Sequence, residues 1–205
     1  MNDKQKIVIF ILALLCNFTF LATANATGIT GKALPECGSR FGADSMETKR
    51  NMAALQDDYS AKNFSVAYNW WHYVFTNAPC SYKSIYQYGP AIITNLIDKP
   101  EYASRRNNLI DTLFMCYEAK FKYFPTEAFP TKGNLALNIN KYKPSLNDKA
   151  LEYYRQYVDE NKEKGLEPAF LTFYMKTASD LTKENKYSLE NSINLYEELS
   201  MYVSN

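Results

Sequence analysis

The sequence lacks the motifs that usually carry catalysis. It has one histidine, His72, and four cysteines without a C-x-x-C pair, and it contains neither a glycine-rich phosphate loop nor a G-x-S-x-G turn. A single imidazole, without a second one or a pair of carboxylates at metal-ligand spacing, makes a poor metal or acid–base site. We therefore predict that the protein is not an enzyme and uses no cofactor.

The chain also lacks an excess of charge of either sign. It carries 23 Lys+Arg and 22 Asp+Glu, and removal of residues 1–26 would leave equal numbers of basic and acidic side chains. Proteins that bind nucleic acids or anionic membrane surfaces need a basic excess. The sequence therefore predicts no nucleic-acid partner.

Only one long hydrophobic run occurs, and it lies at the N-terminus. Two lysines precede an apolar stretch over residues 7–21, and small residues of the A-x-A type follow it, as is typical of a secretory signal peptide. The run of about 15 residues is shorter than the roughly 20 that a membrane span needs. We therefore expect cleavage after Ala24 or Ala26 and no integral span afterwards. Cys16 makes a lipoprotein signal the alternative, although a leucine precedes it where a small residue is required.

No segment alternates in the way of a β-strand, and apolar residues instead recur at helical spacing. The sequence predicts a signal peptide over 1–26, an irregular glycine-containing leader over 27–44 and an all-α domain over 45–205. Ser45, Ser81 and Asn147 are the expected N-caps. The helices are expected over 45–60, 64–79, 81–97, 101–124, 130–142, 147–165, 168–182 and 187–203.

The stretch from Phe64 to Pro79 has the clearest helical pattern in the chain. Phe64, Ala67, Trp71 and Val74 are separated by three, four and three residues, and Pro79 ends the run. This pattern resembles the second helix of a tetratricopeptide repeat, a hairpin of two helices. In that repeat the position of Trp71 is a core position. Later pairs keep the spacing with more substitutions.

Over roughly residues 37–203, the chain resembles exported tetratricopeptide-like proteins of Bacteroidota. Segments 68–79, 85–89 and 111–117 carry the likeness. The resemblance implies an α-solenoid of about three to four antiparallel hairpins. It also implies protein binding at a periplasmic or outer-membrane-associated location in a Gram-negative bacterium.

A solenoid of hairpins has a concave groove lined by the first helix of each pair. A mixed polar, cationic and aromatic lining suits an extended peptide or a partner's helix, so we predict a scaffold or adaptor that binds another envelope protein or peptide. An alternative is a protein that binds a small molecule or glycan through its tyrosine-rich surface and Trp70. A third is an enzyme or redox protein that relies on Cys116 or His72. The expected groove residues are Lys49, Met52, Gln56, Tyr59, Lys83 and Tyr86.

Three cysteines follow the expected signal peptide. Cys37 precedes the first predicted helix and Cys80 follows the second, and these two ends are neighbours in an antiparallel pair. We therefore predict a Cys37–Cys80 disulfide, which would stabilise the fold by about 3–4 kcal/mol. Cys116 lies among apolar residues and is expected to be a small buried side chain.

Overall fold

The structure, a computed structural model, describes residues 29–126 and 131–203. The chain divides into two units, residues 1–31 and 32–205, and the described helices belong to the second. The expected signal peptide lies outside the described residues. Among the residues that are described, no helix is both long enough and apolar enough to cross a membrane.

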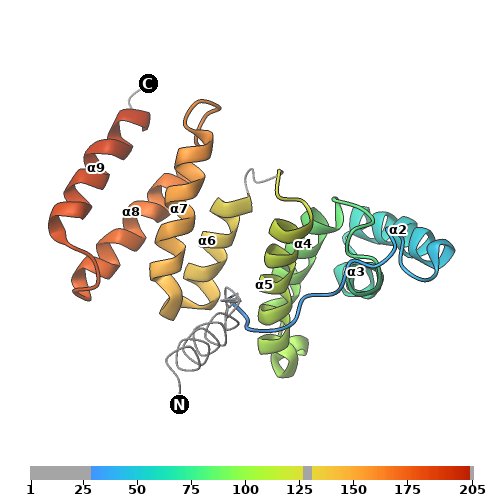
Figure 1. Cartoon of the computed structure of the whole chain (residues 1–205). Helices are drawn as coiled ribbons and strands as arrows, with labels where there is room; N and C mark the ends of the chain where they lie inside the picture. The colour runs from blue at the N-terminus through green and yellow to red at the C-terminus, as the bar shows by residue number, and fades with distance from the viewer. Residues whose placement is uncertain (1–28, 127–130, 204–205) are drawn as a thin grey trace, which may run out of the picture. The chain divides into compact units, whose positions relative to one another are not determined.

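The described part of the chain is helical and contains no strand, which confirms the prediction of an all-α fold. Consecutive helices pack against one another from α2 to α9 (Figure 1). Residues 29–44 form no helix, as expected of the leader. The elements are α2 Ser45–Ser60, α3 Phe64–Asn77, α4 Ile85–Ile97, η1 Pro100–Arg105, α5 Arg106–Tyr123, α6 Thr131–Tyr142, η2 Pro144–Leu146, α7 Asn147–Asn161, α8 Pro168–Lys183 and α9 Leu189–Val203.

The helix starts differ from the predicted caps. Asp44, not Ser45, caps α2, because its carboxylate accepts a hydrogen bond from the backbone N–H of Glu47 at 2.9 Å. The Ser81 hydroxyl donates to the Ala78 carbonyl instead of capping a helix, and α4 begins only at residue 85. The helix expected over 101–124 is divided into the 3-10 helix η1, which begins at a proline, and α5.

The core of the first helices is built around Trp71. Its ring is fully buried, stacks on Phe75 with ring centroids 4.8 Å apart, and donates from Nε1 to the Ile85 carbonyl at 2.7 Å. A Cβ atom at Gly89 of α4 would lie 2.6 Å from this ring, so the close packing of α3 on α4 requires glycine there. Trp71 is therefore a core residue, as predicted.

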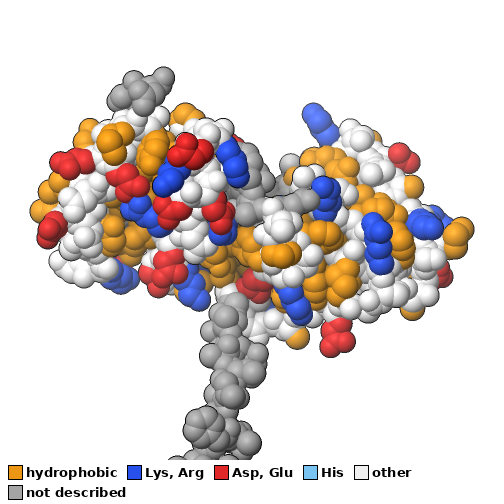
Figure 2. Space-filling model, turned by 45° about the horizontal axis from the view of Figure 1, so that its top comes forward, with side chains coloured by type: hydrophobic (Ala, Val, Ile, Leu, Met, Phe, Trp, Pro, Cys, Tyr) orange, Lys and Arg blue, Asp and Glu red, His pale blue; other side chains and the backbone are white. Residues whose placement is uncertain are grey.

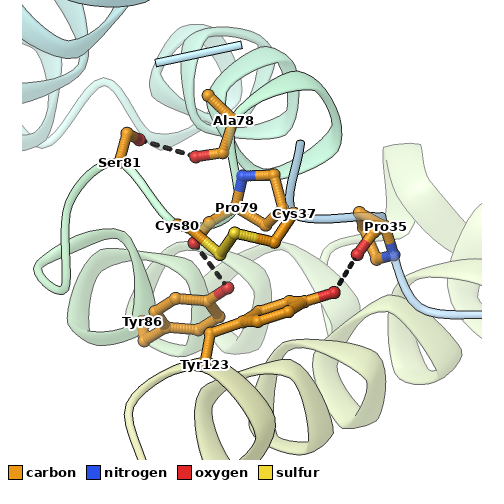
Figure 3. The surroundings of a disulfide bond; sticks show 8 residues. All are labelled: Pro35, Cys37, Ala78, Pro79, Cys80, Ser81, Tyr86 and Tyr123. Carbon is orange, nitrogen blue, oxygen red and sulfur yellow. Dashed lines mark hydrogen bonds between the residues drawn. A yellow bond between two sulfur atoms is a disulfide. The ribbon is translucent and has the colours of Figure 1, made fainter. Parts of the chain in front are cut away.

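The segment 32–44, which we call the strap, is joined to the helices at several points (Figure 3). Cys37 forms a disulfide with Cys80, with Cα atoms 5.7 Å apart, which confirms the predicted pair. The Tyr123 hydroxyl of α5 donates to the Pro35 carbonyl. The strap is thus connected both to the segment after α3 and to α5.

Polar contacts join the N-terminal half, α2–α5, to the C-terminal half, α6–α9. The Asn138 amide of α6 donates to the Tyr117 hydroxyl of α5 at 2.9 Å. Lys143, just after α6, forms an ion pair with Asp111 of α5 at 3.0 Å. The contact between the two halves therefore includes a hydrogen bond and an ion pair, beside the stacked rings of Phe121 and Tyr153.

Candidate functional site

A groove of about 630 Å³ lies between α6 and α8 and is bounded also by η2 and the start of α7. Three apolar side chains, Leu137, Pro144 and Phe173, line it. Phe173 is 41% exposed although it is a large aromatic residue in the middle of a helix. We call this the α6–α8 groove.

Two contacts fix how α6 and α8 lie against each other. A Cβ atom at Gly133 would lie 2.9 Å from the Phe170 ring, so the two helices approach closely near their starts. About two turns further along both helices, the Thr177 hydroxyl of α8 donates to Oδ1 of Asn140 of α6 at 3.0 Å. From the first contact to the second, the residue number increases by seven in α6 and also in α8, so the two helices run parallel. The groove opens on the side of the second contact.

Asn140 holds three helices together at the groove. Its Nδ2 donates to Oδ1 of Asn147 at 2.7 Å, and its Oδ1 accepts from the hydroxyl groups of Tyr154, at 2.8 Å, and Thr177. Burial raises the pKa of Tyr154, so its hydroxyl stays protonated and able to donate at neutral pH. Asn147, a predicted cap, serves instead as the acceptor for Asn140.

Charged side chains of both signs form the rim of the groove. Lys141 pairs with Asp98 of the N-terminal half at 2.7 Å, and this hydrogen bond raises the pKa of the lysine. Lys176 pairs with Asp180 within α8, and this hydrogen bond lowers the pKa of the aspartate. On the face shown in Figure 2, acidic and basic side chains are likewise interspersed over the C-terminal half. The rim is therefore charged without a strong excess of one sign.

Two of the six residues that were expected to line a groove are core residues. Met52 is 4% exposed and Tyr86 is 3% exposed. The Tyr86 ring packs against Phe75 and Phe124, and its hydroxyl donates to the Pro79 carbonyl at 2.9 Å (Figure 3). The prediction is wrong for Met52 and Tyr86, because the apolar packing of α2 and α4 covers them.

The other four expected groove residues lie at or near the surface of the N-terminal half. Lys49 is exposed, with its ammonium 5.4 Å from the centre of the Phe41 ring in the strap. Tyr59 is half-buried against Tyr88, with ring centroids 4.7 Å apart. Gln56 and Lys83 are also exposed. None of the six lines the α6–α8 groove.

The structure also places the three residues expected in the alternative ligand or redox functions, which are Trp70, His72 and Cys116. Trp70 donates from Nε1 to Asp58 of α2 at 2.9 Å. His72 is exposed, but partial desolvation, together with Arg105, lowers its pKa. Cys116 is fully buried, as expected, and burial raises the pKa of its thiol despite the opposing effect of a nearby lysine. The thiol therefore stays protonated near neutral pH.

Within residues 29–126 and 131–203, no group of three or more His, Cys, Asp or Glu side chains is placed to hold a metal ion. Comparisons with protein-family models, with curated proteins and with solved structures found no match. The function of the candidate site is therefore inferred from its geometry.

The residues at the centre of the groove were missed by sequence reasoning, although a signal was present. The helix expected over 130–142 contains Asn134, Asn138 and Asn140. Asparagine is a poor helix former, because its amide competes for backbone hydrogen bonds. Several asparagines in one short helix indicate side chains that make specific hydrogen bonds.

Proposed function

We propose that this chain is a non-enzymatic, exported helical-repeat protein that binds a peptide segment of another envelope protein in the α6–α8 groove. The observation that carries the proposal is the groove itself, in which a half-exposed Phe173 lies beside the fixed amide of Asn140. Export is supported by the Cys37–Cys80 disulfide, because disulfides persist in oxidising compartments.

The helix order supports a tetratricopeptide-like stack as the scaffold for this groove. Consecutive helices pack against each other, and α6 also packs against α8, the helix two places further on. Parallel packing of alternate helices is what a stack of hairpins α6–α7 and α8–α9 produces. In such a stack α6 and α8 are the first helices of their pairs, so the groove lies on the inner face.

The chemistry of the groove suits an extended peptide. A carboxamide has two N–H donors and two acceptor lone pairs, and those that the contacts within the fold do not use can pair with a peptide C=O or N–H. Asn138 uses its Nδ2 within the fold, which leaves its Oδ1 as an acceptor, and Asn140 keeps one amide N–H as a donor. Asn138 and Asn147 line the groove beside Asn140. Phe173 and Leu137 supply an apolar surface for one or two side chains of the bound segment.

A small glycan is the second candidate ligand. An aromatic ring beside several amide and hydroxyl groups also suits a sugar, which offers an apolar face and a rim of hydroxyl groups. Phe173 and Thr177 of the groove provide this combination. A glycan would fill one compact site, whereas a peptide would continue along α6 and α8.

The proposal is tested by selecting ligands from large, unbiased libraries. Residues 27–205, purified in oxidised form, are screened against a random peptide display library and against a glycan array. We expect peptides with an apolar anchor residue to be selected, and Phe173→Ala to weaken their binding about tenfold or more.

Val66→Ala serves as the matched control for Phe173→Ala. Val66 of α3 is 42% exposed, nearly the same fraction as Phe173, and lies in the other half of the molecule. Its replacement should leave the affinity unchanged. Selected peptides that bind the Phe173→Ala protein as tightly as the wild type would rule out this groove, and array hits confined to glycans would favour the second candidate.

A further inference from the structure

The last helix, α9, carries apolar residues on two faces. Leu195 and Leu199 are 1% and 5% exposed and belong to the face that is packed in the fold. Leu189, Ile193 and Tyr196 are 66%, 49% and 63% exposed. These three are spaced by four and three residues, so they form one stripe along the helix. The stripe lies roughly a quarter-turn around the helix from the packed face. We call them the α9 stripe.

The α9 stripe continues into a second groove, between α8 and α9. This groove has a volume of about 330 Å³, and Tyr196 of the stripe forms part of its wall. Leu171 and Leu199, both nearly buried, line it, as does Met175 of α8. The α8–α9 surface therefore combines a protruding apolar row with an apolar depression. A ridge next to a groove is the surface shape against which another helix can pack its side chains.

The charge beside the stripe is of one sign. Helix α9 contains three glutamates and neither lysine nor arginine. Glu198 is held by Arg155 of α7, with both carboxylate oxygens 2.7 Å from the guanidinium. Glu190 and Glu197 are exposed and, among the residues that the structure describes, have no cationic partner. Seven residues separate them, so they follow one edge of the stripe.

This arrangement distinguishes among the surfaces that could cover α9. In an antiparallel pair of α9 helices from two copies, Glu190 and Glu197 of both copies would lie on the same side of the interface and repel. An anionic membrane surface would be repelled for the same reason. A helix with an apolar face and a row of Lys or Arg along one edge satisfies both the stripe and the glutamates.

We propose that the α8–α9 surface is a second docking site, which binds an amphipathic helix of a partner protein through an apolar face flanked by basic residues. The site is separate from the α6–α8 groove, since the two use different sides of α8. Phe173 and Thr177 line the α6–α8 groove, whereas Leu171 and Met175 line the α8–α9 groove. The site can therefore be tested independently of the proposed function.

The test uses designed helical peptides of about 18 residues, long enough to form a helix on binding. One contains leucine at helical spacing with lysine elsewhere, and the other carries glutamate in place of lysine. Fluorescence anisotropy of labelled peptide, added to residues 27–205, should show saturable binding of the lysine peptide. The glutamate peptide should bind at least about tenfold more weakly.

Two double variants locate the binding. Ile193→Ser with Tyr196→Ser should weaken binding of the lysine peptide about tenfold or more, because it removes the apolar anchors. Glu190→Lys with Glu197→Lys should reverse the preference, so that the glutamate peptide binds better. Circular dichroism verifies that each variant keeps its helical content.

Matched double variants on the other half provide the controls. Met46→Ser with Val66→Ser removes apolar side chains that are 69% and 42% exposed, and Asp57→Lys with Glu101→Lys reverses two exposed acidic charges. Neither should change the affinity or the preference. The proposal is overturned if the charge reversal on α9 leaves the peptide preference unchanged. It is also overturned if light scattering shows a dimer that the Ile193→Ser, Tyr196→Ser variant abolishes, since a second copy would then cover α9.

Discussion

The two halves of the molecule are stabilised in different ways. In the N-terminal half the core is a set of packed rings around Trp71, and the strap adds the Cys37–Cys80 disulfide. In the C-terminal half the buried Tyr154 donates a hydrogen bond from its hydroxyl to Asn140, which is only half-buried. Buried rings such as Tyr154 and Tyr174 pack there too, but hydrogen bonds from Tyr154 and Thr177 to Asn140 link the helices around the α6–α8 groove. The α6–α8 groove and the α8–α9 groove both lie in the C-terminal half.

The largest expected effect is in the ring core. Trp71→Ala should lower the free energy of unfolding by about 3–5 kcal/mol, because it leaves a cavity and removes the hydrogen bond to the Ile85 carbonyl. Urea titration followed by circular dichroism measures the loss. Trp70→Ala is the control, and its cost should be about 1 kcal/mol, since this ring is only half-buried. Equal losses in the two variants would show that the N-terminal half has no such core.

Removal of the disulfide should give the next largest effect. Cys37 and Cys80 are 43 residues apart, and a loop of this size corresponds to about 3–4 kcal/mol in the chain-entropy account. Both tryptophans belong to the N-terminal half, so tryptophan fluorescence reports on that half. Reduction, or Cys37→Ala with Cys80→Ala, should shift the fluorescence transition in urea more than the transition seen by circular dichroism. Identical transitions for oxidised and reduced protein would contradict the stabilising role.

Close packing against glycine occurs in both halves and allows a direct comparison. Gly89→Ala places a methyl group 2.6 Å from the Trp71 ring, and Gly133→Ala places one 2.9 Å from the Phe170 ring. Each should cost about 1–3 kcal/mol of stability through overpacking. Gly38→Ala, with no neighbouring atom within 4 Å, is the control and should be close to neutral. If Gly133→Ala is also neutral, α6 and α8 are not held in the register that forms the groove.

The polar centre of the C-terminal half should be sensitive to loss of a single amide. Asn140→Ala leaves the hydroxyl of Tyr154 without its acceptor and should cost about 1–3 kcal/mol. Asn134→Ala, in the same helix, removes a half-buried side chain and keeps the backbone carbonyl of residue 134, which is the atom that accepts the hydrogen bond from Asn138. It should change stability by less than about 0.5 kcal/mol. Thermal unfolding of the two variants side by side makes the comparison. A larger loss in Asn134→Ala than in Asn140→Ala would argue against the hydrogen-bonded centre.

The smallest effect is expected for the ion pair that joins the two halves. Lys141 and Asp98 are both about half exposed, so solvent screens their attraction. A double-mutant cycle with Lys141→Met and Asp98→Asn should give a coupling of less than about 1 kcal/mol, reduced further by added salt. A coupling of several kcal/mol would mean that the halves are joined more by charge than by packing.

Sequence reasoning located the elements that depend on local pattern. The helix α3 begins at Phe64 as predicted and ends at Asn77, two residues before the predicted end at Pro79. The Cys37–Cys80 pair follows from the antiparallel order of α2 and α3. Helical periodicity identifies the apolar face of a helix, but it does not tell which neighbour covers that face. Tyr86 was therefore assigned to an open groove although three aromatic or backbone partners enclose it.

The α6–α8 groove could not be predicted because it depends on contacts between distant residues. Its width is set where Phe170 meets Gly133 and where Thr177 meets Asn140, and each of these pairs is 37 residues apart in the chain. No local pattern reports such a pairing. The asparagines of α6 were the one visible sign, and they indicated hydrogen-bonded side chains without naming their partners.

Hydrogen exchange of the peptide complex tests most directly where the binding site lies. A peptide selected on residues 27–205 is added to saturation, and backbone exchange is compared with that of the free protein by mass spectrometry. We predict slower exchange in α6 and α8, with unchanged exchange in α2 and α4. Protection confined to α2 and α4 would contradict the proposed site, because it would place the ligand on Lys49, Gln56 and Lys83, where the sequence pattern alone had put the groove.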